Sequence, residues 1–222
     1  DELNKVLLRT KTHVQRFEAD KTVVQNSSES SLVNVNVGTE QITSKVVVGC
    51  DGRDSIVNKV GNFSSLTRRY PLSSFVCTVV CDAAYPAAFQ KFSDRGILAL
   101  LPMSSMHPLY NVVFTTSNEY AQELNSLPEE ELINHLRSIW NMPNDAPSII
   151  KLNTSAKGYF PLFRSHVDQY YAWDGKLFVL GDAAHSMLPI AGQGLNSGMY
   201  DITEYIKIIQ DNIETGHEIS KV

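Results

Sequence analysis

The stretch that decides the fold is residues 181–201, which reads GDAAHSMLPIAGQGLNSGMYD. An apolar run, Leu177 to Leu180, precedes it and predicts a short buried strand. Asp182 follows the end of that strand, a loop of small residues comes next, and Gly194 begins a segment with helical spacing. This order brings a carboxylate close to the free N–H groups of a helix N-terminus, an arrangement that can bind a polyol beside an anionic group.

A second motif has the same design. Residues 46–55 read VVVGCDGRDS, an apolar strand that ends in a glycine and Asp51. An Asp-Gly pair is also a common turn, so a purely structural role for Asp51 and Gly52 stays open. Two strands that each end in a glycine and an acid predict an α/β domain with a ligand at the strand ends.

Together the two motifs resemble the DG and GD fingerprints of the FAD-dependent aromatic hydroxylases, the para-hydroxybenzoate hydroxylase-like family. The sequences FSDRGILALLP at 92–102 and PIAGQG at 189–194 are similar to the ubiquinone-biosynthesis branch of that family. The resemblance extends from about Leu3 to Ile209. It implies a partial Rossmann-like FAD-binding domain with an inserted mixed-sheet domain that binds the substrate, an α/β fold with an α+β insert.

The resemblance also implies a set of cofactor-binding residues. Asp182 would accept hydrogen bonds from the ribityl chain of FAD, and Pro189 would lie beside the reacting end of the flavin. The helix N-terminus would place N–H groups near the flavin pyrimidine edge, where reduced flavin carries negative charge. The full set is Gly181, Asp182, Ala183, Pro189, Gly192, Gln193, Gly194, Leu195 and Asn196, with Asp51 and Gly52 from the DG motif.

The DG motif would contact both FAD and the nicotinamide cofactor. In the family it usually continues Ser-x-Val-Arg, whereas here Asn58 follows Ser55-Ile56-Val57, a departure at the place where the reductant would dock. His185 lies inside the GD motif, and we expect it to pack or to hold a loop by a hydrogen bond. No catalytic side chain is assigned, and no metal-ligating cluster is recognised.

The implied reaction is aromatic hydroxylation. NAD(P)H would reduce FAD, O₂ would form a flavin C4a-hydroperoxide, and its distal oxygen would pass to an aromatic small-molecule substrate, a polyprenylated phenol in ubiquinone biosynthesis. Three alternatives stay open. They are a different aromatic hydroxylase, a flavin reductase of the same superfamily, and a non-catalytic or split subunit that cannot hold FAD alone.

One expected motif is missing. A dinucleotide-binding domain should carry GxGxxG after its first strand, and the chain has none. The chain also begins at Asp1 without a methionine. We therefore expect a fragment, completed by an N-terminal segment or a partner chain that grips the ADP part of FAD.

Composition narrows the class of protein. Of 222 residues, 43% are hydrophobic and 19% charged, which is typical of a globular protein. A net charge of −5 argues against a nucleic-acid surface, and three cysteines indicate a reduced, intracellular chain. No apolar run approaches a membrane span of about 20 residues. The expected location is the matrix side of the mitochondrial inner membrane in a eukaryote, otherwise the cytoplasm or the inner-membrane periphery, with membrane contact if the substrate has a polyprenyl tail.

The pattern along the chain predicts two interleaved domains. Residues 1–66 and 167–222 would form the FAD-binding domain, and residues 67–166 the substrate-binding sheet domain. Helices are expected at 2–13, 117–124 and from a Ser126–Glu129 capping box to Trp140. Strands are expected at 14–18, 32–37, 42–48, 74–81, 97–101 and 110–115, with Cys77 and Cys81 buried on one face. Leu195, Met199, Ile202, Ile206 and Ile209 would face the core from the last helix.

Overall fold

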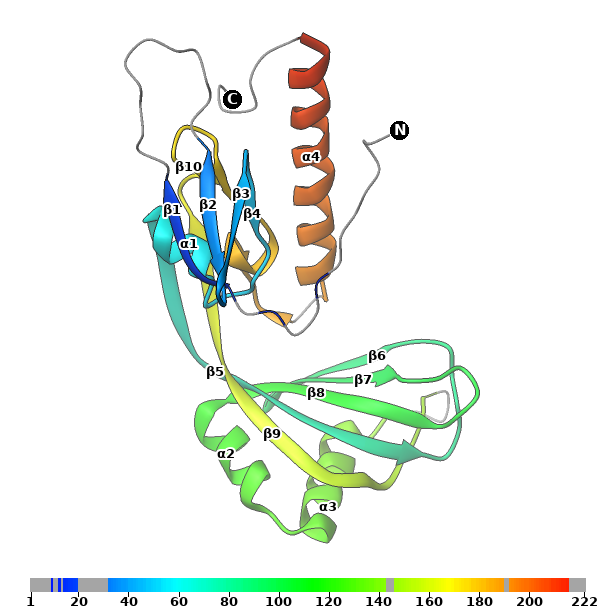
Figure 1. The fold of residues 1–222 in the computed structure, drawn as a ribbon. Coiled ribbons are helices and arrows are strands. Elements are labelled where there is room, and N and C mark those ends of the chain that lie inside the picture. Colours follow the sequence, from blue (N-terminus) through cyan, green and yellow to red (C-terminus); the bar gives the residue numbers. More distant parts are fainter. Residues whose placement is uncertain are drawn as a thin grey trace, which may run out of the picture. The chain divides into compact units, whose positions relative to one another are not determined.

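The computed structural model describes Arg9, Thr12 and residues 14–19, 32–142, 146–189 and 192–215. The helix expected at 2–13 lies almost entirely outside them. The chain has an α/β fold that divides into two compact units. Unit 1 is Asp1–Leu66, Ser165–Ser186 and Gln193–Val222, and unit 2 is Thr67–Arg164 with Met187–Gly192. Strands β5 (Ser65–Cys81) and β9 (Ile149–Val167) pass from one unit into the other (Figure 1).

Unit 1 contains two small sheets. One is an antiparallel meander of β1 (Val14–Ala19), β2 (Val33–Val37) and β3 (Glu40–Ser44). The other has the order β10-β11-β4, made of β10 (Tyr171–Ala172), β11 (Leu177–Val179) and β4 (Val47–Gly49). The single strand expected at 42–48 is therefore wrong. The chain turns between β3 and β4, where the Ser44 hydroxyl donates to the Val46 carbonyl at 2.6 Å, and the two strands join different sheets.

Short elements and one long helix complete unit 1. They are α1 (Ile56–Gly61), the 3-10 turn η1 (Gly181–Ala183), β12 (His185–Ser186) and α4 (Gly194–Thr215). The core of the unit consists of apolar residues from β2, α1, β9, β11 and η1, namely Val33, Val57, Val167, Leu177, Val179, Ala183 and Ala184. The strand expected before the GD motif and the helix expected from Gly194 are both confirmed.

Helix α4 packs on a different face from the one expected. None of its residues is buried, and Leu195 is 77% exposed. The face that makes contact is instead the polar and aromatic one. The Asp201 carboxylate accepts from Gly181 N–H, and the ring of Tyr205 lies 5.0 Å from that of Phe178. The apolar spacing correctly predicted a helix, but four residues of its predicted stripe are exposed and the fifth, Ile209, is half-buried.

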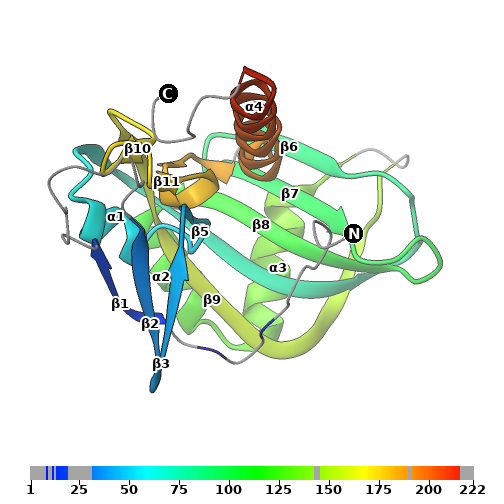
Figure 2. The same ribbon diagram turned by 45° about the horizontal axis from the view of Figure 1, so that its top comes forward.

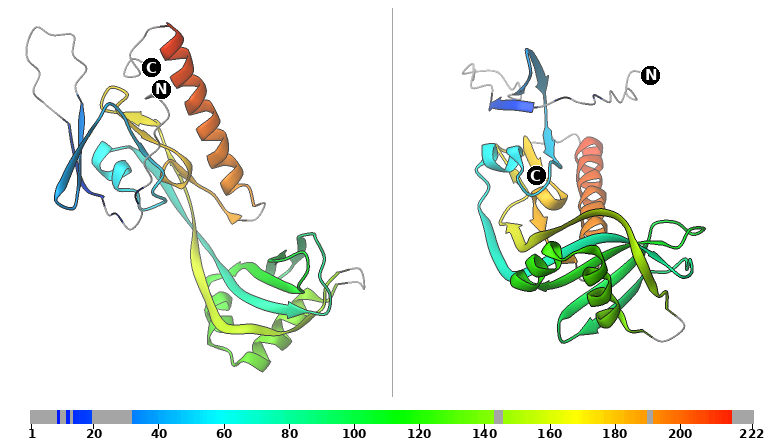
Figure 3. Two further views of the ribbon diagram at one scale, coloured as in Figure 1. Left: turned by 45° about the vertical axis from the view of Figure 1, so that its right-hand side comes forward. Right: turned by 90° about the horizontal axis from the view of Figure 1, so that it is seen from below.

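Unit 2 is a sheet with two helices on one face (Figures 2 and 3). The strand order is β12-β9-β5-β8-β7-β6, in which the edge strand β12 belongs to unit 1, and the strands not yet named are β6 (Phe89–Ser93), β7 (Gly96–Pro102) and β8 (Leu109–Ser117). The β5–β8, β8–β7 and β7–β6 pairs are antiparallel. Helices α2 (Asn118–Ser126) and α3 (Glu129–Trp140) pack against it.

Successive side chains along each strand point to opposite faces of the sheet. On β7, Leu98 and Leu100 are fully buried against the helices, while Ile97, Ala99 and Leu101 point to the other face. Cys77 and Cys81 are buried, as predicted, and burial raises the pKa of both thiols to about 12. The sheet therefore has one face sealed by helices and one apolar face that they leave uncovered.

Helix α3 begins differently from the sequence expectation. Pro128 is the N-cap residue and no side chain caps the helix, so the predicted capping box is wrong. The hydroxyl of Ser126 donates instead to the Glu123 carbonyl, 2.7 Å away, in the last turn of α2. Three glutamates in the first turn of α3 supply the negative charge that favours a helix N-terminus. No helix in the described ranges has both the length and the apolar character needed to span a bilayer.

The sealed face supplies the stability of unit 2. Leu136 of α3 is fully buried, so Leu136→Ala removes apolar contacts and leaves a cavity. We expect a loss of about 2–5 kcal/mol in the free energy of unfolding, measured by urea denaturation. Leu66→Ala is the matched control, because Leu66 is 77% exposed and its truncation should cost under about 0.5 kcal/mol. Equal losses in the two variants would contradict this account of the core.

Candidate cofactor site

The site in unit 1 starts from a parallel strand pair. Strand β4 pairs with β11 in parallel, so that Gly49 lies opposite Val179. One step further, the N–H of Leu180 donates to the Gly49 carbonyl at 3.0 Å. Because parallel strands end at the same edge of a sheet, residues 50–52 and 180–182 emerge side by side. The two acidic motifs, far apart in sequence, therefore meet at one edge.

The turn after β4 is held by its own side chains. The Asp51 carboxylate accepts from the N–H of Ile56 at 2.7 Å, and the Ser55 hydroxyl accepts from the N–H of Asn58 at 2.9 Å. Both bonds satisfy orphan N–H groups at the start of α1. Asp51 thus has a structural task in the turn, and its neighbours Cys50 and Gly52 line the cavity described below.

Asn58, the departure from the family pattern, joins the two motifs. Its amide Nδ2 donates to the carbonyl of Ala183 at 3.0 Å, which connects α1 to the turn after β11. The sequence marked this position as unusual, but only the structure shows what the asparagine does.

The turn after β11 is pressed against α4. Gly181 has φ +58°, a left-handed conformation that suits glycine, and a Cβ on Gly198 would lie 3.4 Å from the Gly181 Cα. A Cβ on Gly198 would thus just reach van der Waals contact with the turn, and at Gly181 the positive φ is what disfavours a side chain. The two glycines allow the N-terminal part of α4 to approach the strand edge closely.

A buried polar pair fixes the same contact. Oδ2 of Asp201 accepts from the N–H of Gly181 at 2.8 Å and lies 2.6 Å from Nε2 of His185. The side chains of His185 and Asp201 are each 11% exposed. Because a carboxylate only accepts, Nε2 carries the hydrogen. His185 holds a loop by a hydrogen bond, as expected, and its partner Asp201 was not foreseen although it ends the motif.

These elements enclose a cavity of about 400 Å³, within the range of small-molecule sites. Among the predicted residues, it is lined by Gly52, Gly181, Asp182, Gly194 and Leu195. Its other wall residues were not predicted as ligands, namely Cys50, Leu180, Gly198, Met199 and Ile202. Asp182 is an exposed acid on this wall, and the first N–H groups of α4 border the same space. The carboxylate can accept hydrogen bonds from a polyol, and the N–H groups can donate to an anionic group.

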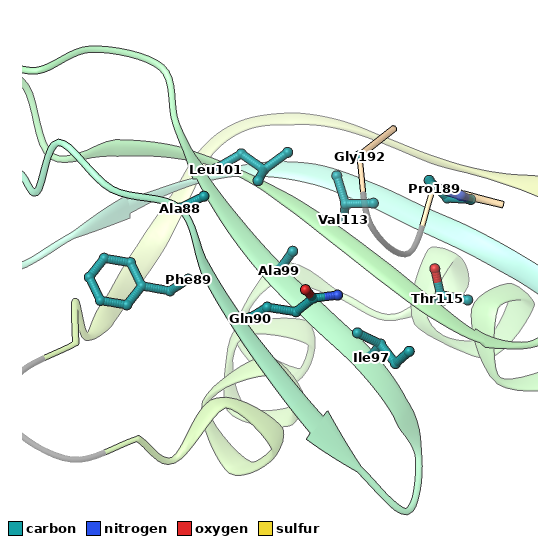
Figure 4. Close-up of a pocket in the computed structure, with 10 residues that line it drawn as sticks. All are labelled: Ala88, Phe89, Gln90, Ile97, Ala99, Leu101, Val113, Thr115, Pro189 and Gly192. Atoms are coloured by element: carbon teal, nitrogen blue, oxygen red, sulfur yellow. The ribbon is translucent and has the colours of Figure 1, made fainter. Parts of the chain in front are cut away.

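The remaining predicted residues lie elsewhere. Ala183 is buried in the core of unit 1, and the side chains of Gln193 and Asn196 bond to each other at 3.1 Å. Pro189 and Gly192 belong to unit 2 and line a different cavity, of about 380 Å³. It lies on the uncovered face of the sheet, and Figure 4 shows its wall residues on β6, β7 and β8. We call it the β6–β8 cavity, lined by Ala88, Phe89, Gln90, Ile97, Ala99, Leu101, Val113, Thr115, Pro189 and Gly192.

The fold and the site have the features of an α/β cofactor-binding domain, in which ligands bind at the carboxyl ends of parallel strands. The model of the FAD binding domain family matches residues 2–218. The chain belongs to this FAD-binding-domain family. The predicted α/β fold class is confirmed.

Several curated relatives share one description, ubiquinone biosynthesis monooxygenase COQ6, mitochondrial. The protein from Schizosaccharomyces pombe is 28% identical over 99% of the chain and 54% of its own length. The mouse protein is 28% identical over 88% of the chain and 47% of its own length, and the human one 26% over 88% and 48%. The chain spans about half the length of these relatives.

Solved structures show the same fold at low identity. A probable FAD-dependent monooxygenase from Pseudomonas aeruginosa, PqsL, aligns with a TM-score of 0.69 and 21% identity, over 94% of this chain and 56% of its own. An aklavinone-11 hydroxylase, solved with FAD and aklavinone, aligns with a TM-score of 0.66 and 12% identity, over 91% and 37%. At these identities the likeness concerns the fold alone.

The buried pair gives a direct test of the site. Asp201→Asn removes the charge that accepts from Gly181 and His185. We expect unfolding in urea to become easier by about 2 kcal/mol and the Gly181 amide to exchange its hydrogen faster. Asp211→Asn, at an exposed position of the same helix, should change neither quantity. Unaltered exchange at Gly181 in the Asp201 variant would show that the pair does not hold the turn.

Cys50 offers a second test, because it is the exposed cysteine of the three. Partial burial, and then the charges of Asp51 and Asp201, raise the pKa of its thiol above the usual value. Iodoacetamide should therefore label Cys50 before Cys77 and Cys81, but more slowly than free glutathione at pH 8, with a rate that rises as pH increases. Asp51→Asn should speed the reaction at a fixed pH, as followed by mass spectrometry. Faster labelling of either buried thiol would contradict the assignment.

Proposed function

We propose that the chain is the flavin-holding and substrate-binding part of an NAD(P)H-dependent monooxygenase that hydroxylates an aromatic ring. The observation that carries the proposal is the cavity at the shared end of β4 and β11, with Asp182 on its wall and the start of α4 beside it. Membership of the FAD-binding-domain family and the COQ6 relatives support the same reading.

The residues of this cavity fit FAD. In the proposal, the Asp182 carboxylate accepts from ribityl hydroxyls, and the N–H groups at the start of α4 face the electron-rich edge of the flavin. Gly194 lines this cavity and has open space where a side chain would stand, which leaves its backbone accessible. When bound, FAD supplies the redox chemistry, taking electrons from NAD(P)H and activating O₂.

The protein's own part is to bind, orient and shelter. The Asp201–His185 pair holds the turn that carries Asp182, and Asn58 ties the same turn to α1. In unit 2, the β6–β8 cavity offers apolar walls of Ile97, Ala99 and Leu101 with the polar Thr115 at one side. We assign the aromatic ring of the substrate to this cavity, because its size and its mostly apolar lining suit a phenol.

The relatives' description suggests the substrate class and the location. We propose a phenol with a polyprenyl tail, hydroxylated in ubiquinone biosynthesis, and a mitochondrial setting on the matrix side of the inner membrane. Contact with that membrane would follow from the poor water solubility of such a substrate.

A split or incomplete enzyme is the second candidate, and one observation favours it. Ile206 and Ile213 of α4 are large apolar residues that are exposed and lie outside the cavity lining, although helices in folded domains usually bury their apolar stripe. Further polypeptide that covers this stripe would complete the FAD site. The experiment that distinguishes these candidates is to purify the chain alone and together with a COQ6-type N-terminal segment, and to measure bound flavin in each preparation. Flavin bound only by the pair supports the split enzyme, and flavin bound by neither supports a non-catalytic protein.

The cofactor assignment is tested at Asp182. In the preparation that binds flavin, Asp182→Asn should weaken FAD binding by about tenfold or more, because a charged acceptor of hydroxyl groups becomes a neutral amide. Quenching of flavin fluorescence gives the affinity, and O₂ uptake driven by NAD(P)H gives the activity. Asp168→Asn, another exposed acid of unit 1, is the control and should behave as the unaltered protein. Equal FAD affinity in both variants would reject the role of Asp182.

O₂ uptake also separates the enzyme classes. Oxidation of NAD(P)H that consumes O₂ and depends on a phenol supports a hydroxylase. Flavin reduction by NAD(P)H that proceeds without consumption of O₂ supports a reductase of the same superfamily.

A further inference from the structure

The uncovered face of the unit 2 sheet carries a second cavity beside the first. It has a volume of about 420 Å³ and is formed by β5, β7, β8 and β9. We call it the β5–β9 groove. Its walls are Val76, Cys77, Thr78, Leu101, Asn111, Val112, Val113, Ala156, Lys157, Gly158 and Phe160.

The groove and the β6–β8 cavity adjoin each other. Leu101 of β7 and Val113 of β8 line both of them. These two residues stand near the middle of the sheet, on the face opposite the helices, and Figure 4 shows both side chains in the wall of the first cavity. A ligand that fills the first cavity can therefore extend over Leu101 and Val113 into the groove without leaving an apolar surface.

The polar groups of the groove are already satisfied by the protein. The Thr78 hydroxyl donates to Oδ1 of Asn111 at 3.0 Å, across neighbouring strands. The ammonium of Lys157 donates to the carbonyl of Leu127, in the connection between α2 and α3 on the helix-covered face. The charge is thereby directed away from the groove, and alternation along β9 turns the neighbours Ala156 and Gly158 toward it. What remains for a ligand is methyl, methylene and aromatic surface.

Phe160 extends this surface at the β9 side. It is 58% exposed, which is unusual for a phenylalanine in a strand that forms part of a cavity wall. An exposed aromatic side chain beside an apolar groove is typical of a site that binds an apolar ligand. A phenol ring alone would fill the first cavity and leave the groove empty.

We propose that the β5–β9 groove is a subsite for the isoprenoid tail of the ring substrate, with Leu101 and Val113 joining it to the β6–β8 cavity. This assignment rests on the proposed function, because it takes the ring to occupy the β6–β8 cavity. The occupant is a linear, methyl-branched chain of isoprene units attached to the ring. The groove then determines the preference for tailed over tail-less phenols.

Binding measurements test the subsite without any need for turnover. Isothermal titration calorimetry would compare 4-hydroxybenzoate carrying hydrogen, prenyl, geranyl or farnesyl at ring position 3. We expect binding to tighten by about tenfold for each added isoprene unit until the groove is filled, since each unit removes several carbons from water. Binding that does not change with tail length would overturn the subsite while leaving the ring site intact. Failure of all four compounds to bind would overturn the proposed ring site as well.

Two variants with different chemistry locate the tail. Phe160→Asp places a charge in the groove, and Gly158→Leu fills it, since a side chain at Gly158 meets no atom within 4 Å. Each should lose most of the gain from the farnesyl tail and bind the tail-less ring as before. Phe92→Asp is the matched control, because Phe92 is also an exposed phenylalanine of the same sheet, at 70%, and lines neither cavity. Gly158→Leu keeps the test valid if the charged variant folds poorly.

Two further results would also reject the proposal. One is a Phe92 variant that weakens farnesyl binding as much as the Phe160 variant does. The other is a dimer, seen by analytical ultracentrifugation, that Phe160→Asp converts to a monomer while the dependence on tail length stays unchanged. In that case the groove would be an interface between two copies of the chain.

Discussion

The parallel pairing of β4 with β11 is the constraint on which the site of unit 1 depends. Because both strands end at the same edge, the turns at 50–52 and 180–182 become neighbours, and the Leu180 N–H to Gly49 carbonyl bond extends the pairing to the point where they diverge. A shift of the pairing register between β4 and β11 by one residue would turn the side chains of the shifted strand to the opposite face of the sheet. Helix α4 then borders the cavity where Gly181 and Gly198 bring two backbones close together.

Three aspartates near this edge have separate tasks. Asp51 accepts a backbone N–H and shapes the turn that leads into α1. Asp201 is nearly buried and holds Gly181 and His185, so that it joins α4 to the strand edge. Asp182 is the exposed one and stands on the cavity wall. Structural hydrogen bonds thus occupy two of the acids, and the third is exposed on the wall of the cavity. This division explains how a short motif can contain both framework and binding residues.

In unit 2, the two faces of one sheet have different surroundings. Alternation along β7 and β8 sends Leu98, Leu100 and Phe114 into a core sealed by α2 and α3. The same alternation sends Leu101 and Val113 to the opposite face, where the helices do not reach. A sheet that is apolar on both faces but covered by helices on one has apolar surface left for a ligand. The cavity and the groove on that face are the consequence.

The sequence by itself determined the local elements and the family. The apolar run before Gly181, the helix from Gly194 and the burial of Cys77 and Cys81 all follow from short-range periodicity, which depends on neighbouring residues alone. Periodicity failed where the outcome depends on distant partners. It merged β3 with β4, which belong to different sheets, and it placed the apolar stripe of α4 in a core that the described residues do not provide. Only the tertiary structure brought Asp201 to His185, Asn58 to Ala183, and Leu101 and Val113 to a shared boundary between two cavities. Such contacts are set by long-range strand pairing and by close backbone approach, and no local pattern records which distant residue will be the partner.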